Sequence, residues 1–219
     1  MARVFHPRSN VLARVTLLGL PLLGAITGLV AWGVERSPYV TKQGVHWEQP
    51  VLFSHEHHVG GLGIDCRYCR TSVTESSFAG LPPTKTCMTC HSQVWTSAPL
   101  LEPVRESWRT GIPIQWRRDN NVPNYVYFDH SIHVAKGVGC VTCHGQVDQM
   151  PLTYQAKPLT MSWCLDCHRE PEEHLRPREE VFNLHYVAPP DQERFGRELA
   201  ERYHVRSSRA LTDCYTCHR

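Results

Sequence analysis

Five Cys-x-x-Cys pairs account for all ten cysteines of this 219-residue chain. The pairs are Cys66/Cys69, Cys87/Cys90, Cys140/Cys143, Cys164/Cys167 and Cys214/Cys217. In four pairs the next residue is a histidine, and these histidines are His91, His144, His168 and His218. Two thiols followed at once by an imidazole form the pattern in which the thiols bond to the haem vinyl groups and the imidazole binds the iron. The sequence therefore predicts several covalently bound haem c groups.

Two other interpretations of the paired cysteines explain less of the pattern. Two Cys-x-x-Cys knuckles can close a tetrahedral zinc site, but zinc gives no reason for a histidine at the same offset after each pair. A disulfide framework is a weaker alternative still.

The first pair departs from the pattern because it is followed by Arg70 in place of histidine. A guanidinium group stays protonated and has no lone pair to donate to iron. Either a haem is attached at Cys66 and Cys69 with its proximal ligand from elsewhere, or this site carries no haem. Arg70 as a strain variant or a misread position is a third explanation. The prediction is therefore five haem c groups, or four if the first site is empty.

A run of twenty uncharged residues, from Val15 to Val34, lies near the N-terminus. A helix of about twenty residues crosses a bilayer core of ~30 Å, so residues 15–34 are predicted to be a transmembrane anchor. The basic start at Arg3, Arg8 and Arg14 would also fit a signal peptide. The apolar run is longer than a signal h-region and no Ala-x-Ala site ends it, which favours an uncleaved anchor.

The charges that flank the anchor predict its orientation. Basic residues precede it and Glu35 follows it, which places residues 1–14 in the cytoplasm and the remainder on the periplasmic side of the inner membrane. Covalent haem attachment takes place on that same side. Gly24 and Gly28 form a small-xxx-small pattern that suits an integral membrane partner, although glycine is also simply common in membrane helices. The formal net charge of +2 argues against a nucleic-acid-binding protein.

The part of the chain after the anchor contains an internal repeat. Phe53-Ser-His-Glu-His-His-Val59 aligns with Phe128-Asp-His-Ser-Ile-His-Val134, and each segment precedes two Cys-x-x-Cys pairs. In this alignment His144 is the counterpart of Arg70. The predicted organisation after the anchor is a linker at 35–50, a first dihaem module at 51–98, a connector at 99–125, a second dihaem module at 126–175, and a C-terminal helix with the fifth haem site at 176–219.

The ratio of chain to haem predicts the fold class. Five haems would leave roughly 37 residues of the outer part for each, too few for every haem to have its own polypeptide core. We therefore expect a mostly irregular and helical fold built around packed haems. Two helices are predicted in it, a short one near Val104 to Trp108 and a longer one from Asp191 to Tyr203. Asp191 is the expected N-cap, ion pairs are expected for Arg194/Glu198 and Glu198/Arg202, and Phe195, Leu199 and Tyr203 form an apolar stripe.

Five six-coordinate haems need ten axial ligands, and the Cys-x-x-Cys-His motifs supply four. Two His-x-x-His elements, His55/His58 and His130/His133, are predicted to supply four more. Their i,i+3 spacing on a helical turn places both imidazoles near one face, from which each can reach a different haem.

Two axial positions remain. Met161 is the candidate for one, because a thioether is a haem ligand that raises the reduction potential, and Met150 is its rival. Met161 could instead fill a gap in the core. The other position is the proximal ligand that Arg70 cannot be, with five unranked candidates: His46, His57, His174, His185 and His204.

The Phe-x-His-x-x-His element followed by Cys-x-x-Cys-His pairs resembles the class III multihaem cytochromes. One N-terminal anchor, five haem sites and the stretch Pro158-Leu-Thr-Met-Ser-Trp-Cys-Leu-Asp-Cys-His-Arg-Glu-Pro171 resemble, over residues 10–219, the pentahaem cytochrome c of bacterial alternative complex III. The resemblance implies that an integral membrane partner oxidises quinol, in a respiratory or photosynthetic complex with iron-sulfur or cytochrome subunits. This chain would relay electrons to a periplasmic carrier or terminal oxidase and would not be catalytic alone. Arg70 departs from that family's pattern.

Two other functions stay open at this point. A self-sufficient quinol dehydrogenase, similar to the small tetrahaem cytochromes of nitrate and nitrite respiration, would need a quinol pocket beside a haem on this chain. A catalytic multihaem reductase would need a haem with an open position, which the first module could offer, together with an acid/base cluster that the sequence does not show around it.

Overall fold

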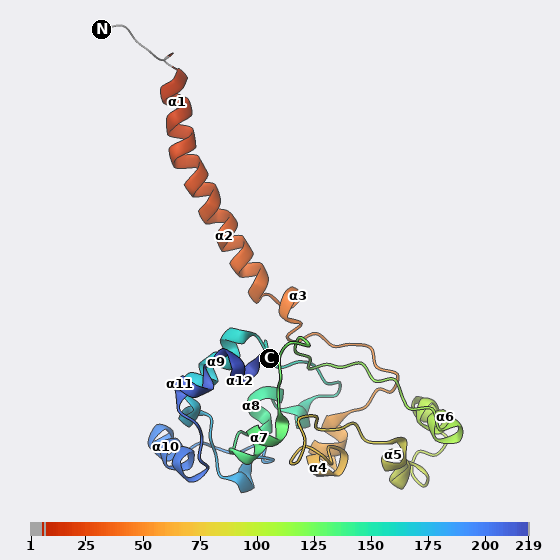
Figure 1. Ribbon diagram of the computed structural model, residues 1–219. Coiled ribbons are helices and arrows are strands. Elements are labelled where there is room, and N and C mark those ends of the chain that lie inside the picture. The colour runs from red at the N-terminus through yellow and green to blue at the C-terminus, as the bar shows by residue number, and fades with distance from the viewer. Residues whose placement is uncertain (1–5, 7, 219) are drawn as a thin grey trace. The chain divides into compact units, whose positions relative to one another are not determined.

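The computed structural model of the chain describes residue 6 and residues 8–218 (Figure 1). The chain divides into two compact units between Lys42 and Gln43.

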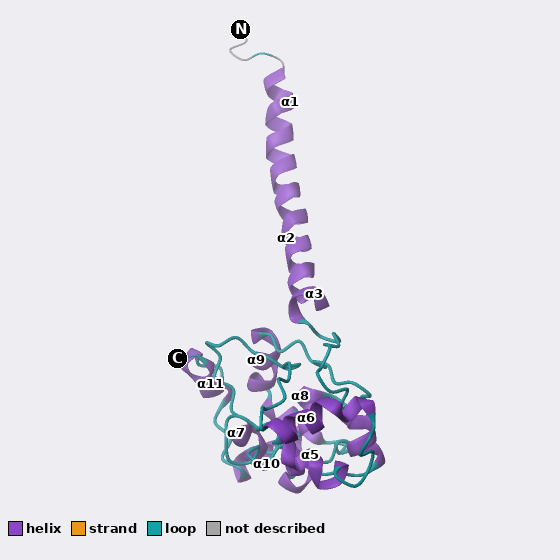
Figure 2. Ribbon diagram, turned by 90° about the vertical axis from the view of Figure 1, so that its right-hand side faces the viewer, coloured by secondary structure: helices purple, strands orange, loops and turns teal. Residues whose placement is uncertain are grey.

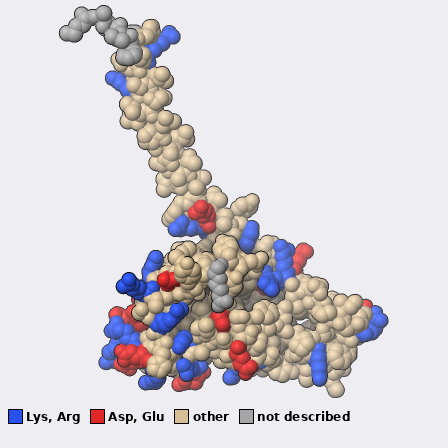
Figure 3. Space-filling view, in the orientation of Figure 1, with Lys and Arg blue, Asp and Glu red and all other residues tan. Residues whose placement is uncertain are grey.

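The N-terminal unit contains a long apolar helix. It is built from α1 (Arg8–Arg14), the π-helical turn η1 (Val15–Gly19) and α2 (Leu20–Arg36). Together these elements form a helix of 29 residues that contains an 18-residue window with a mean hydropathy of 1.9 and no buried residue. The helix is therefore long and apolar enough to cross a membrane. Figure 3 shows no charged side chain between the two ends of this helix. The predicted anchor at 15–34 lies inside it, whereas Arg3 lies outside the described residues.

Helix α2 stops at a proline. Ser37 takes an extended conformation before Pro38, as a residue that precedes proline prefers, and the short helix α3 (Pro38–Thr41) follows.

The second unit is made of short helices joined by loops (Figure 2). Its elements are η2 (Glu56–Gly61), α4 (Cys66–Cys69), α5 (Thr84–His91), η3 (Pro99–Leu101), α6 (Glu102–Thr110), α7 (His130–Ala135), α8 (Cys140–His144), η4 (Val147–Gln149), α9 (Met161–Arg169), η5 (Pro171–Glu173), η6 (Arg178–Glu180), α10 (Gln192–Arg202), α11 (Ser208–Leu211) and α12 (Cys214–Cys217). Between described residues the only β pairing consists of three isolated bridges. The expectation of a mostly irregular and helical fold is confirmed.

The polypeptide core of this unit is small. Nine hydrophobic side chains are buried among its described residues: Val51, Val73, Val104, Met150, Leu175, Val181, Leu184, Leu199 and Tyr203. The main cluster joins Leu175, Leu199 and Tyr203, with Phe195 packed against it, so the predicted apolar stripe of α10 is confirmed. A unit of this length with so few buried apolar side chains suits a fold whose cofactors supply much of its core.

The two predicted helices are present with small differences. Helix α6 is longer at both ends than expected, and it terminates at Gly111, whose φ of 73° lies in the left-handed region that glycine tolerates. Helix α10 begins at Gln192, and Asp191 before it makes no side-chain capping bond.

The ion pairs expected along α10 were wrong. Asp191 pairs with Arg194, and Glu193 pairs with Arg197. Both acids stand at the start of the helix, where carboxylates also interact favourably with the helix dipole, and the two arginines point back towards them. Gly196 lets this helix approach η5, because a Cβ atom there would lie 1.9 Å from the Glu172 carbonyl oxygen.

The two repeat halves are joined by reciprocal backbone hydrogen bonds. The Glu56 amide donates to the Met150 carbonyl at 3.0 Å, and the Ser131 amide donates to the Ser76 carbonyl at 3.2 Å. Glu56 and Ser131 occupy the same repeat position. Ser76 and Met150 each lie six residues beyond the residue that follows their own half's first cysteine pair. Each half therefore holds the histidine turn of the other, and we call these two contacts the crossed bonds.

Candidate haem sites

Each Cys-x-x-Cys pair lies on a helical turn, which places its two thiols on one face. Side-chain caps start three of these helices. Asp65 accepts from the Arg67 amide at 2.8 Å, Asp213 accepts from the Tyr215 amide at 2.9 Å, and Thr160 caps α9. All ten thiols are free, so the disulfide alternative finds no support. The zinc alternative finds none either, because the described residues contain no group of three or more His, Cys, Asp or Glu side chains that could hold a metal ion.

Six of the predicted ligands form three pairs of facing imidazoles. The ring centroids of His130 and His144 are 6.3 Å apart. Those of His133 and His168, and those of His58 and His91, are 6.2 Å apart. A metal-bound imidazole nitrogen lies about 2.0 Å from the metal and the ring centroid about 1.1 Å behind it, so two imidazoles on opposite sides of one iron have centroids about 6.2 Å apart. The three pairs therefore have the spacing that bis-histidine haem ligation requires.

The second nitrogen of most of these rings is held by a backbone carbonyl. Six Nδ1 atoms lie 2.7–3.2 Å from carbonyl oxygens: His58 (Ser54), His91 (Val94), His130 (Ser77), His133 (Asp129), His168 (Leu211) and His218 (Tyr125). A carbonyl can only accept, so Nδ1 carries the proton and Nε2 keeps its lone pair. This arrangement is common for metal-binding histidines, whose orientation and tautomer it fixes.

The phenylalanine of each repeat orients both histidines of its turn. Phe53 stacks on His58 at 4.3 Å and meets His55 edge-on at 4.8 Å. Phe128 stacks on His133 at 4.6 Å and meets His130 edge-on at 4.7 Å. Sequence reasoning used the phenylalanines only to align the repeat. Their role could have been found from their fixed place two residues before each His-x-x-His element.

Burial favours the neutral form of four of the predicted ligands. It lowers the pKa of His55 to about 4, with the nearby Arg70 cation contributing, and it lowers the pKa of His144 to about 4 as well. Burial also lowers the pKa values of His58 and His133. A neutral imidazole has the lone pair that a metal needs.

The first site keeps the repeat geometry except for its anomalous residue. His55 lies near Arg70, as His130 lies near His144. The Arg70 guanidinium donates through Nη1 to the Gly80 carbonyl at 2.6 Å. The Nδ1 atom of His55 is buried with no hydrogen-bond partner, unlike that of its counterpart His130.

Three of the five spare histidine candidates have other neighbours. His46 meets the Tyr154 ring at 4.8 Å, His57 stacks with Trp95 at 6.3 Å, and His185 pairs with Asp148 at 2.7 Å. Of the other two, His174 lines a small pocket and His204 follows the end of α10. The structure gives no reason to prefer any of them as a ligand.

The fifth site contains His218 without a facing imidazole among the described ring contacts. Its ring lies 5.7 Å from that of Tyr125. Met150 is 3% exposed and packs in the core, whereas Met161 is 63% exposed at the first residue of α9. A buried core position accounts for Met150 without ligation, so Met161 stays the predicted thioether ligand.

The thiols of successive sites lie close to one another. Burial raises the pKa of Cys87, and the charge of the nearby Cys69 raises it further. A hydrogen bond that the Cys140 thiol donates to Cys66, together with burial, raises the pKa of Cys140. The spatial order of these sites is therefore 87/90, 66/69 and 140/143, and Figure 1 shows α5, α4 and α8 in that order.

The same contacts continue into the C-terminal sites. Burial raises the pKa of Cys143 to about 12, with Cys167 and Cys164 adding to the effect. Burial likewise raises the pKa of Cys164, and Cys217 contributes. The order therefore runs on from 140/143 to 164/167 and then to 214/217.

Two of the predicted haem-binding cysteines differ from the other eight in exposure. Cys90 and Cys214 are exposed, whereas the other thiols are half-buried. The pairs of Cys90 and Cys214 stand at the two ends of the spatial order, where a neighbouring site covers each pair from one side only. Both residues stay predicted haem attachment points, because the other cysteine of each pair is on the same helical turn.

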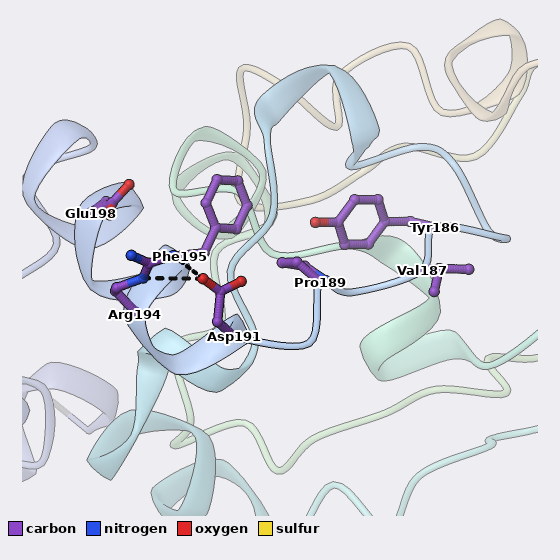
Figure 4. Close-up of a pocket in the computed structure, with 7 residues that line it drawn as sticks. All are labelled: Tyr186, Val187, Pro189, Asp191, Arg194, Phe195 and Glu198. Carbon is purple, nitrogen blue, oxygen red and sulfur yellow. Dashed lines mark hydrogen bonds and ion pairs between the residues drawn. The ribbon is translucent and has the colours of Figure 1, made fainter.

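A surface pocket of about 390 Å³ lies apart from these residues (Figure 4). Its lining is Tyr186, Val187, Pro189, Asp191, Arg194, Phe195 and Glu198, and the Asp191–Arg194 ion pair crosses it. No cysteine of the five pairs and no predicted axial ligand is among these lining residues.

Comparison with known proteins agrees with this geometry. The profile of the family described as cytochrome c7 and related cytochrome c matches residues 126–219, which hold three of the five cysteine pairs. The multihaem cytochrome c subunit of the menaquinone reductase of Nitratidesulfovibrio vulgaris strain Hildenborough is 34% identical over 176 residues, covering 70% of this chain and 81% of that protein. The chain belongs to the multihaem c-type cytochromes. The cytochrome thus carries haem c and transfers electrons, as expected. The number of haems stays a prediction, and alternative complex III is named by neither comparison.

Proposed function

We propose that this cytochrome is the electron-relay subunit of a membrane-bound quinone oxidoreductase. The observation that carries the proposal is the unbroken spatial sequence of five cysteine pairs, each close to the next. Haems attached to them would lie in one row, and a row of closely spaced haems conducts electrons without a substrate pocket of its own. The apolar helix Arg8–Arg36 would anchor this row to the membrane, with the N-terminus in the cytoplasm and the haem unit in the periplasm.

The proposed ligand set follows from the facing rings. His58 and His91 would hold the haem of Cys87/Cys90. His130 and His144 would hold that of Cys140/Cys143, and His133 and His168 that of Cys164/Cys167. Each His-x-x-His turn thus serves two neighbouring haems, and the first and second dihaem modules at 51–98 and 126–175 are units of haem binding within one fold. His218 and Met161 are proposed for the fifth haem.

The proposed partners are an integral membrane subunit that reacts with quinone, iron-sulfur or cytochrome subunits of the same complex, and a periplasmic electron carrier or terminal oxidase. The sequence resemblance to alternative complex III favours flow from quinol outwards. The name of the menaquinone reductase relative favours the opposite direction, from a periplasmic donor to menaquinone. A row of haems supports either direction, because the potentials of its two ends decide which is downhill.

Native purification tests the proposal. We expect the cytochrome to leave detergent-treated membranes with a polytopic subunit, and its haems to be reduced by a menaquinol analogue only while that subunit is present. Rapid reduction of the isolated cytochrome by the same quinol would instead support the self-sufficient quinol dehydrogenase. Mass spectrometry of the denatured chain counts the haems, because thioethers survive unfolding, and five are expected.

A further inference from the structure

We propose that the haem at Cys66 and Cys69 has His55 as its only protein ligand, and that Arg70 makes the opposite iron face a binding site for a small inorganic anion. This inference rests on the proposed haem relay and adds a ligand site to it.

The repeat shows where the two faces of this haem lie. In the second module, His130 and His144 stand on opposite sides of one position, with rings 8° from parallel. Their counterparts are His55 and Arg70. His55 can bind iron and Arg70 cannot, so only the His55 face has an endogenous ligand.

The other histidines that surround this site have partners already. His58, on the same turn as His55, faces His91 at 6.2 Å. His144 lies near Arg70 but faces His130. None of them is available to take the place of a proximal histidine without breaking another pair.

Arg70 is fixed in place and lacks a close anion. Its Nη1 group donates to the Gly80 carbonyl, which holds the guanidinium without neutralising it. Among the described residues the charges that reach it are those of Cys69, Cys66 and Asp119. The two cysteines can carry no charge once they are thioethers.

Asp119 is also engaged elsewhere. Its two carboxylate oxygens accept from Gln49 at 3.1 Å and from Thr153 at 2.5 Å. A half-buried cation beside an iron face without a protein ligand is an arrangement that favours an anion bound to both. The matched position in the second module holds one imidazole. Azide, cyanide and nitrite are anions of that size or smaller and are therefore suitable ligands.

The test uses the purified complex and the probe azide. In the oxidised parent we expect high-spin haem by electron paramagnetic resonance and a Soret shift on azide addition. Arg70→His should convert one haem equivalent from high spin to low spin and remove the azide response. Because the fifth site also lacks a facing imidazole, the difference between parent and Arg70→His isolates the first site.

The charge of Arg70 is tested separately. Arg70→Gln should keep the high-spin haem and weaken azide binding about tenfold or more, since a hydrogen bond to a charged group contributes ~1.5–3 kcal/mol. Arg67→Gln is the matched control, because Arg67 lies in the same Cys-x-x-Cys loop, is exposed and pairs with Asp65. It should leave azide affinity unchanged.

Two results would overturn the inference. One is that Arg70→His has the same spectrum as the parent. This result would mean that another side chain already occupies the iron face opposite His55. The other is equal azide affinity in the parent and Arg70→Gln, as expected if haem propionates neutralise Arg70. Haem count by mass spectrometry and reduction by quinol are measured on the same samples. If the haem count and the reduction by quinol are unchanged while either of these results is found, only the anion site is rejected and the proposed electron relay is not affected.

Discussion

The two halves of the haem unit reach the same ring geometry from different backbones. In the first half His58 lies on the π-helical turn η2 and His55 is its N-cap residue, whereas in the second half both histidines lie on the α-helix α7. The distances from Phe53 and from Phe128 to their histidines nevertheless agree within 0.3 Å between the halves. The aromatic contact, more than the helix type, therefore sets the positions of the imidazoles.

The halves differ most at their first haem site. The second half has a histidine after its first cysteine pair. The Nδ1 atom of His130 in this half is hydrogen-bonded to the carbonyl of Ser77, which belongs to the first half. The first half has Arg70, and the Nδ1 atom of His55 has no such support. In the ligand set that we propose, one haem of the repeat therefore has two imidazole ligands, whereas its counterpart has one.

Removal of a paired histidine should have the largest effect. His58→Ala and His133→Ala each take one strong ligand from a haem that we assign to two imidazoles, so each should turn one low-spin haem into a high-spin haem. Electron paramagnetic resonance of the oxidised protein measures this. Tyr154→Phe, away from the facing rings, is a control, and unaltered spectra in both alanine variants would contradict the pairing.

The second-largest effect is expected from removing the phenylalanine that contacts both histidines of each repeat. Phe53→Ala and Phe128→Ala should loosen the rings of one half each and destabilise the fold by about 2–3 kcal/mol, less than for a fully buried phenylalanine because Phe128 is partly exposed. Chemical denaturation of the haem-loaded protein gives the free energy of unfolding. If only one of the two variants is destabilised, Phe53 and Phe128 do not have the same role in their two halves.

Exchange of the predicted thioether should shift a single potential. Met161→Leu removes a ligand that raises the reduction potential, so one haem should fall by on the order of 100 mV in a redox titration. Lys85 is the repeat counterpart of Met161, and Lys85→Leu should leave all potentials in place. If the redox titration curve of Met161→Leu is the same as that of the parent, Met161 is not a haem ligand.

The smallest effect concerns the helix caps of the first cysteine pairs. Asp65 caps α4, whereas α8 follows Gly139 and has no side-chain cap. Asp65→Ala should cost about 1 kcal/mol of stability. The hydrogen bond from Arg67 lowers the pKa of Asp65 below its ordinary value of 3.8, so the cap contributes above that pH and is lost as the pH falls through the lower, folded-state value. Denaturation of parent and variant at neutral pH and near pH 2 should therefore show a difference that vanishes in acid.

Much of this organisation could be predicted from local sequence. The cysteine pairs, the His-x-x-His elements and the apolar helix are short patterns whose meaning depends on spacing along the chain. The partner of each histidine could not be predicted, because His133 and His168 are brought together only by the tertiary fold. The same holds for the carbonyl of Ser77 behind His130, for the exposure of Cys90, and for the order in which the sites follow each other in space. The ion pairs of α10 were missed because several arginines and glutamates offer near-equal alternatives on an exposed surface.

The crossed bonds also affect the order in which the two halves of the haem unit can fold. In a chain made from its N-terminus, the amide of Glu56 is present well before the Met150 carbonyl that accepts from it. The earlier half cannot complete its fold until the later half has arrived. The turn that carries His55 and His58 therefore gains this backbone contact only together with the second half, so the two halves fold as one cooperative unit.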